Sequence, residues 1–105
     1  MRTEFPKGVY PVMLTPFTED NKVDYESLGR LIEWYIDAGV AGLFVVCQSS
    51  EMFFLSLEER VEITRFVVEK AAGRVAVVSS GHISESLEDQ AKELNEIAKA
   101  GADAV

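Results

Sequence analysis

The stretch Gly42-Leu43-Phe44-Val45-Val46 is apolar at nearly every position, and the polar or small residues Cys47-Gln48-Ser49-Ser50-Glu51 follow it directly. An apolar run without alternation is typical of a strand that is covered on both faces, as in a parallel sheet. Ligands of parallel α/β proteins bind beyond the carboxyl ends of the strands. The abrupt change at residue 47 therefore marks the first place to look for a site.

Amphipathic segments lie on both sides of this strand. The segment before it begins at Asp24, a favourable N-cap residue, and ends at Gly39, which supplies the left-handed C′ position. In the segment after it, Ser56 and Glu59 have the spacing of a capping box, and Gly73 ends the segment. Apolar residues recur at helical spacing: Leu28, Leu31, Ile32, Tyr35 and Ile36, then Ile63, Phe66, Val67 and Ala71.

The same alternation continues toward both ends of the chain. Residues 8–14 form an earlier apolar run, in which Pro11 lacks a ladder donor, and residues 74–79 form a third strand. A third helix is expected to open at Ser84 or Ser86 and to precede a last apolar run. The predicted inner stripe of this helix consists of Leu87, Ala91, Leu94 and Ala98.

Strict alternation of strands and helices predicts an α/β fold with a parallel sheet and right-handed crossovers. A doubly wound open sheet and a closed barrel both fit this pattern, and periodicity does not choose between them. Neither strand–helix loop carries a G-x-G-x-x-G dinucleotide fingerprint. A closed (β/α)8 barrel (a TIM barrel) typically needs ~250 residues. Under that interpretation residues 1–105 are the N-terminal portion of a single barrel domain, about its first three and a half βα units.

Composition excludes several classes of function. The net charge of −8 argues against nucleic acid and against an anionic membrane surface as partners. No segment approaches the ~18 consecutive apolar residues of a membrane span, and the first residues lack the apolar region of a secretory signal. The single cysteine fits a reducing cytosol, and with one histidine it leaves no metal-ligand cluster. We therefore expect a cytoplasmic protein without a metal or cofactor.

Candidate site residues follow each expected strand. Gln48, Ser49 and Ser50 offer amides and hydroxyls for an anion and for proton transfer, or they cap the next turn. Glu51 is a candidate general base, or a carboxylate that holds the loop.

Three further residues have alternative interpretations. Cys47 with His82 as base would make a nucleophilic pair, or Cys47 is a small packed residue and His82 a loop residue. Thr15 turns the chain before a proline and has a hydroxyl that would face the pocket. The hydrophobic residues 52–55 are a lid, a subunit contact or core.

Several short motifs, taken in order, resemble the dihydrodipicolinate synthase / N-acetylneuraminate lyase family from about residue 8 to residue 105. The residues that carry the resemblance are Gly8-Val9-Tyr10-Pro11, Leu14-Thr15-Pro16-Phe17, Val23-Asp24 with Leu28, Gly39, Gly42-Leu43, Leu55 with Glu58-Glu59-Arg60, Gly73-Arg74-Val75 and Gly101-Ala102-Asp103-Ala104. The resemblance implies a TIM barrel and a class I aldolase-type lyase or synthase. It also implies pyruvate or another 2-keto acid as substrate, an aldehyde partner, and a homo-oligomer, a tetramer in the family.

The implied chemistry is a Schiff base between the keto carbon and a lysine from a later barrel unit. None of the lysines of this chain matches that position, so the chain alone is expected to be inactive. The family has G-[ST]-T-G-E where this chain has Cys47-Gln48-Ser49-Ser50-Glu51. Ser49 falls on the relay threonine and keeps a hydroxyl, and Gln48 falls on the residue that holds the keto acid's carboxylate.

Only Glu51 is identical to the family signature, so the pocket is expected to be altered. Cys47 and Ser50 replace glycines, and a left-handed backbone at either would be strained. Two rival functions remain open. One is a non-catalytic barrel that binds a small acid or serves as a subunit, and the other is a hydrolase or transferase that uses Cys47 and His82.

Overall fold

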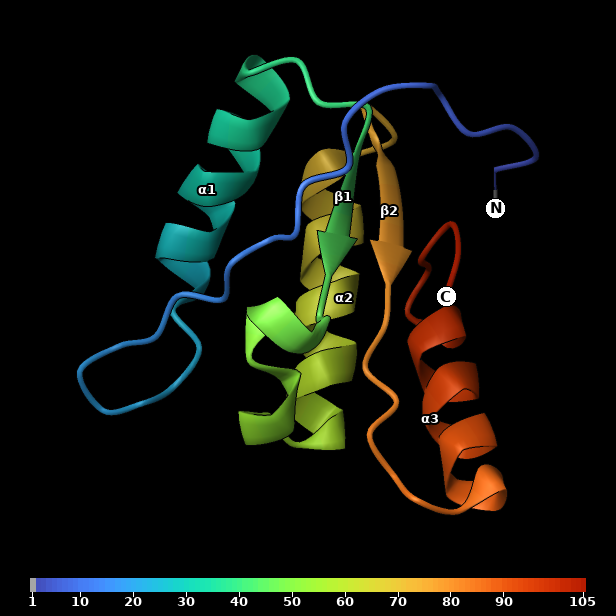
Figure 1. Ribbon diagram of the computed structural model, residues 1–105. Coiled ribbons are helices and arrows are strands. Elements are labelled where there is room, and N and C mark those ends of the chain that lie inside the picture. The colour runs from blue at the N-terminus through green and yellow to red at the C-terminus, as the bar shows by residue number, and fades with distance from the viewer. Residues whose placement is uncertain (1) are drawn as a thin grey trace.

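The computed structural model describes residues 2–105 and shows helices and strands in strict alternation (Figure 1). The elements are α1 (Tyr25–Asp37), β1 (Gly42–Val45), the 3₁₀ turns η1 (Gln48–Ser50) and η2 (Met52–Phe54), α2 (Leu57–Ala71), β2 (Ala76–Ser79) and α3 (Leu87–Lys99). Within this described range no helix is long and apolar enough to cross a bilayer.

The helix starts are those that the sequence predicts. The Asp24 carboxylate accepts from the Ser27 N–H and opens α1, and Ser86 opens α3 in the same way. Ser56 and Glu59 form both bonds of the capping box at the start of α2. The end of α2 differs in detail, because Ala72 takes the first left-handed position and the expected Gly73 only the second.

The sheet is parallel, and its neighbours follow chain order. β1 pairs with β2 in register from Gly42↔Ala76 to Val45↔Ser79. Isolated parallel bridges add Val12 beside Phe44 on one side and Ala104 beside Val78 on the other. The first run therefore pairs as expected, but only at one bridge, since its proline at position 11 donates no ladder bond.

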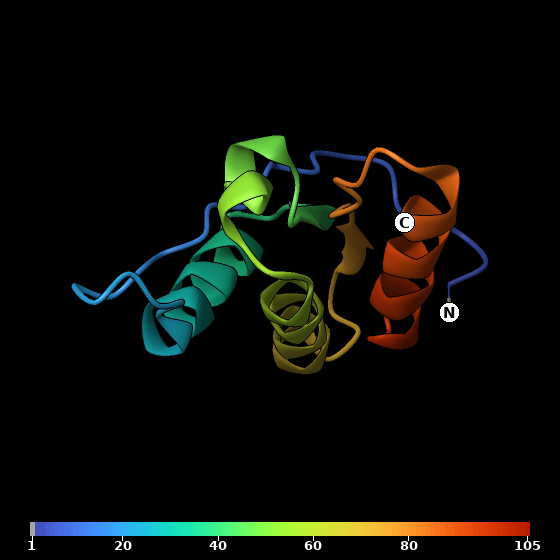
Figure 2. The ribbon, with the colours of Figure 1, turned by 90° about the horizontal axis from the view of Figure 1, so that it is seen from below.

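All three helices lie on one side of the strands (Figure 2), with α1 against α2 and α2 against α3. A doubly wound sheet places helices on both faces and reverses its strand order at a switch point. Neither feature is present in residues 2–105. Of the two architectures compatible with the sequence, this arrangement favours the barrel.

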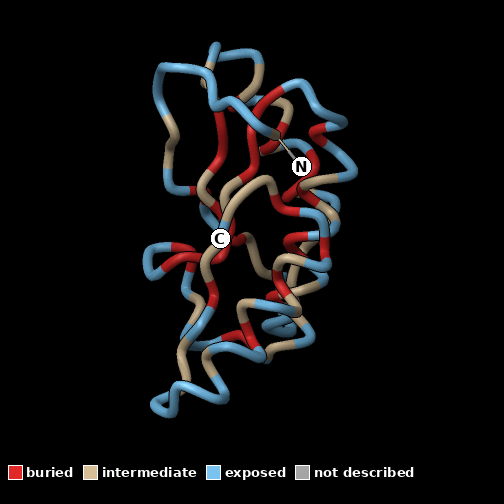
Figure 3. Tube along the Cα trace, turned by 90° about the vertical axis from the view of Figure 1, so that its right-hand side faces the viewer, coloured by how far each residue is buried: buried red, intermediate tan, exposed pale blue. Residues whose placement is uncertain are grey.

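The side chains on the two faces of the strands differ in burial, and Figure 3 marks the buried residues along the trace in red. Leu43, Val45 and Val77 belong to the core between the strands and the helices, and each is almost fully buried. Alternate residues point the other way, and Val12 and Leu14 there are 40% and 59% exposed. An apolar surface on the side without helices is what the interior face of a barrel requires.

The predicted inner stripe of α3 is only partly correct, because Leu94 and Ala98 are half-buried but Leu87 and Ala91 are exposed. Leu87 is 83% exposed, whereas the buried residues of this helix are Glu93 and Ile97. The helix is turned so that Glu93 reaches Arg60 of α2. A buried ion pair between helices is a tertiary contact, and the hydrophobic spacing of α3 alone carries no sign of it.

Candidate active site

The carboxyl ends of both strands lead into the loops that the sequence singles out. Both strand arrows in Figure 1 point toward the end of the molecule where η1, η2 and the start of the β2–α3 connection lie. We call residues 47–51 the 47–51 turn and residues 80–84 the 80–84 loop. They are adjacent at their bases, since the Ser80 N–H donates to the Val45 carbonyl at 3.1 Å.

Left-handed backbone conformations bracket the 47–51 turn. Val46 has φ 51° and Glu51 has φ 64°, whereas Cys47 is extended with φ −100°. Ser50 is not among the residues with positive φ. The expected strain at Cys47 and Ser50 is therefore absent, and it falls instead on their neighbours. A β-branched residue such as Val46 rarely adopts this conformation.

The inner side of the turn is fastened to the first apolar run by buried polar groups. Ser50 is fully buried, and its hydroxyl donates to the Met13 carbonyl at 2.5 Å. Thr15 donates to the Ser50 carbonyl at 2.7 Å, and the Cys47 sulfur lies 3.3 Å from the Ser50 hydroxyl oxygen. Thr15, expected to face the pocket, is thus 8% exposed and supports the turn. Ser50 and Cys47 are also supporting residues.

The outer side of the turn carries Gln48 and Ser49, whose side chains are exposed. The N–H groups of Ser50, Glu51 and Met52 donate to carbonyl groups of the turn itself. Among the contacts of residues 2–105, by contrast, no acceptor within the chain receives the N–H of Gln48 or Ser49. Where the strands end, the turn therefore presents the backbone N–H groups of Gln48 and Ser49 and the Ser49 hydroxyl, none of which is bonded within residues 2–105.

Glu51 and His82 are both exposed at this end of the molecule. In the part of the chain that the structure describes, the Glu51 carboxylate makes no hydrogen bond, so it does not hold the loop N–H groups. It lines a small pocket of about 360 Å³ with Phe17, Asn21 and Phe54. Among the hydrogen bonds of residues 2–105 there is none between His82 and the buried Cys47, so the two do not form a nucleophile–base pair.

Sequence reasoning missed a buried ion pair beside these loops, between Arg60 of α2 and Glu93 of α3. Burial alone would raise the pKa of Glu93, but hydrogen bonds from Ser84, Ile83 and Arg60 outweigh it and hold the pKa below its ordinary value. The available signal was positional. Arg60 lies three residues before Ile63, on the predicted inner stripe of α2, whereas Glu93 lies outside the inner stripe predicted for α3.

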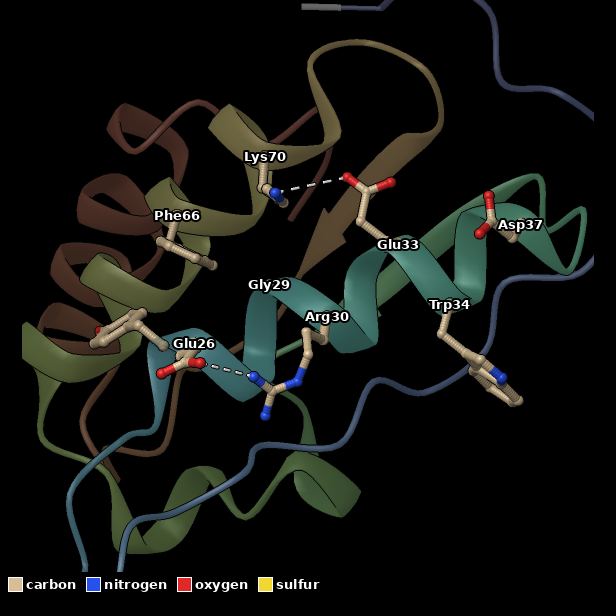
Figure 4. Close-up of a pocket in the computed structure, with 9 residues that line it drawn as sticks. Glu26, Gly29, Arg30, Glu33, Trp34, Asp37, Phe66 and Lys70 are labelled. Atoms are coloured by element: carbon tan, nitrogen blue, oxygen red, sulfur yellow. Dashed lines mark hydrogen bonds and ion pairs between the residues drawn. The ribbon is translucent and has the colours of Figure 1, made fainter.

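Another groove, of about 720 Å³, lies on the outer surface between α1 and α2 (Figure 4). Four of the charged side chains that line it are already paired, Arg30 with Glu26 and Lys70 with Glu33. A groove on the helical side of the strands is remote from the position where barrel proteins bind substrates. Nor does any group of three or more His, Cys, Asp or Glu side chains within residues 2–105 form a candidate metal site.

The strands are parallel and follow chain order, the helices lie on one side, and a polar turn follows the strand ends. These features define a parallel α/β protein. Residues 5–105 match the model of the Dihydrodipicolinate synthetase family. The chain belongs to that family.

Relatives and solved structures agree with this assignment. The chain is 36% identical over 100 residues to N-acetylneuraminate lyase of Citrobacter koseri, covering 94% of this chain and 33% of that protein. It is 41% identical over 100 residues to 4-hydroxy-tetrahydrodipicolinate synthase of Bartonella bacilliformis, with the same two coverages. Dihydrodipicolinate synthase from Aquifex aeolicus superimposes with a TM-score of 0.85 at 32% identity, covering 92% of this chain and 32% of that one. The chain therefore spans about a third of the length of these relatives.

Proposed function

We propose that the full-length protein is a pyruvate-dependent lyase or synthase of the class I aldolase type. In this proposal residues 1–105 are the N-terminal portion of a single (β/α)8 barrel domain, and the enzyme works as a cytoplasmic homo-oligomer. The observation that carries the proposal is the 47–51 turn, which stands at the carboxyl end of parallel strands. Within residues 2–105 the backbone N–H groups of Gln48 and Ser49 have no acceptor. Unpaired N–H groups at this position are suited to a substrate carboxylate.

The relatives narrow the substrate class. Two of the relatives that this chain matches are named N-acetylneuraminate lyase and 4-hydroxy-tetrahydrodipicolinate synthase. A dihydrodipicolinate synthase from Acinetobacter baumannii was solved in complex with pyruvate; it superimposes with a TM-score of 0.87 at 26% identity, over 92% of this chain and 33% of that one. We therefore assign a 2-keto acid, with pyruvate as the first candidate, and an aldehyde as the second reactant.

Gln48 and Ser49, two exposed residues of the turn, then each have a role. The amides of Gln48 and Ser49 hold the carboxylate of the keto acid, and the Ser49 hydroxyl relays a proton. A lysine outside residues 1–105 attacks the keto carbon, and water leaves as the Schiff base forms. The resulting iminium withdraws electrons, so that a carbon–carbon bond at the neighbouring carbon can be made or broken. Because Gln48 is longer than the residue that the family has there, its side chain narrows the pocket.

Borohydride trapping tests this function. The full-length protein is incubated with saturating pyruvate and reduced, and the expected result is a covalent adduct on one lysine, detected by intact mass and peptide mapping. Reduction without pyruvate is the control. An unmodified protein would refute the Schiff-base mechanism. If calorimetry still detected pyruvate binding in that case, the protein would be a non-catalytic barrel that binds a small acid.

Alkylation separates the thiol alternative. Treatment with iodoacetamide should leave the formation of the pyruvate adduct unchanged, because Cys47 is buried and its sulfur is in hydrogen-bond contact with the Ser50 hydroxyl. Loss of activity on alkylation, without loss of the adduct, would favour a cysteine-dependent hydrolase or transferase.

A further inference from the structure

The ion pair between Arg60 and Glu93 is buried close to the candidate site. Each side chain is 5% exposed, and Arg60 Nη1 lies 2.9 Å from Glu93 Oε2. Taking two charges out of water is costly, and their attraction offsets the cost only when the remaining polar atoms are also bonded. A buried pair is therefore weak support for stability as its purpose, and the groups that it binds give a better indication of its role.

Most of those groups belong to the 80–84 loop. Arg60 Nη1 donates to the Gly81 carbonyl. Glu93 accepts from the Ile83 N–H at 2.6 Å, from the Ser84 N–H at 3.2 Å and from the Ser84 hydroxyl. The pair thus binds backbone groups on both sides of His82, whose own side chain is left exposed.

The same loop is pressed against the base of the 47–51 turn. Gly81 is buried with φ 101°, and a Cβ added there would lie only 3.2 Å from Val46 Cγ1 and 3.6 Å from Arg60 Cδ. Val46 itself holds the left-handed conformation that starts the turn. A displacement of the 80–84 loop would therefore be transmitted to Val46, and through it to the amides that follow.

We infer that the Arg60–Glu93 pair is a positioning element of the candidate site, which holds the 80–84 loop against Val46 and so fixes the 47–51 turn. This inference rests on the proposed function, because it assigns the amides of that turn to substrate binding. Arg60 and Glu93 touch no substrate. Their effect is on the affinity for the keto acid, since they set where the binding groups stand.

Two variants of the full-length protein separate positioning from simple support of the fold. The reversed pair, Arg60→Glu with Glu93→Arg, keeps opposite charges on α2 and α3. It removes from α3 the carboxylate that accepts hydrogen bonds from Ile83 and Ser84. Ser84→Ala removes one loop donor and leaves the pair intact, so it remains informative if the reversed pair fails to fold. Glu33→Gln is the matched control, because it weakens an exposed Arg–Glu pair, Arg74 with Glu33, at the other end of the strands.

The expected readouts are a change in KM and a change in amide exchange. The KM for pyruvate should rise about tenfold in the reversed pair, and less in Ser84→Ala, because small misplacements of binding groups weaken binding. Hydrogen exchange should speed up in peptides that cover residues 46–51 and 80–84. A purely structural role would instead reduce the fraction of active enzyme at an unchanged KM, as we expect for the control if it has any effect.

Two results would overturn the inference: an unchanged KM in variants that fold, or faster exchange in the 80–84 loop with none in residues 46–51. Failure of the proposed function is distinguishable, because the wild-type protein would then form no borohydride adduct with pyruvate. The exchange experiment would still decide whether the pair fixes the 47–51 turn.

Discussion

The two loops at the carboxyl end of the strands are held in opposite ways. On its buried side, the 47–51 turn is held by hydrogen bonds from the Ser50 and Thr15 hydroxyls. Its backbone N–H groups at Gln48 and Ser49 have no acceptor within residues 2–105. In the 80–84 loop, the Gly81 carbonyl and the Ile83 and Ser84 amides are engaged by a buried ion pair. This difference fits our two proposals, in which the 47–51 turn binds the keto acid and the 80–84 loop holds that turn in place.

Breaking the ion pair from one side should have the largest effect. Glu93→Leu leaves Arg60 buried without its partner, which should cost about 3–5 kcal/mol of unfolding free energy. Urea unfolding of the full-length protein measures this, and Arg60→Met/Glu93→Leu, which removes both charges, should recover part of the loss. A single variant within 1 kcal/mol of wild type would show that the pair behaves like an exposed one.

Acid should weaken the second loop through the same residue. The pKa of Glu93 is lowered in the folded state, so its contribution to stability is present above the ordinary value of 4.5 and is lost as the pH falls through the lower folded pKa. The urea midpoint of wild type should therefore fall more steeply below pH 4.5 than that of Glu93→Gln. Parallel curves for the two proteins would contradict this sign.

Removing the hydroxyl of Ser49 should affect activity without affecting stability. If this hydroxyl relays a proton, Ser49→Ala should lower kcat by about a hundredfold or more, while Ser49→Thr should keep most of it. The urea midpoint should stay unchanged, because the side chain is exposed. Equal kcat values for Ser49→Ala and wild type would remove Ser49 from the mechanism.

Ser50, one residue further on, should behave in the reverse manner. Ser50→Ala removes the buried donor to the Met13 carbonyl, and this should cost about 1–3 kcal/mol of unfolding free energy. Any loss of activity should then follow from a loosened turn. If Ser50→Ala were as stable as Ser49→Ala, the distinction between the inner and outer sides of the turn would fail.

The smallest effect is expected at the end of the turn. Glu51 holds φ 64° with an exposed side chain, so Glu51→Gly should relieve the left-handed strain and raise the unfolding free energy by about 0.5–1 kcal/mol. Glu51→Ala is the control, because alanine keeps the strain and should give no gain. A glycine variant less stable than the alanine variant would show that the conformation costs little here.

The sequence predicts the parts of this fold that depend on local chemistry. Asp24, Ser56 and Ser86 cap their helices as their spacing indicates, and the alternation of segments predicts parallel strands. The choice of the barrel over the doubly wound sheet needed the strand order and the single helical layer, which are contacts between distant segments. From the sequence alone, the resemblance to the family implied a barrel, whereas the periodicity left both architectures open.

The candidate site was predictable in place but not in detail. The abrupt change after Val46 located the 47–51 turn, because the side on which ligands bind follows from strand direction. The sequence did not show which of these residues support the turn and which are exposed, because Thr15 and Ser50 differ from Ser49 only in what lies opposite their hydroxyls. Arg60 and Glu93 were missed for the same reason, because their ion pair forms only when α2 and α3 pack together.

The single tryptophan lines the outer groove between α1 and α2. Trp34 projects from the outer face of α1 (Figure 4) and is 64% exposed. Its ring packs edge-on against that of Tyr35. It lies near the end of α1 that leads to the start of β1, away from the strand ends. Its emission is therefore a poor optical reporter of ligand at the 47–51 turn, whereas a quencher or a partner that covered the outer groove would change it directly.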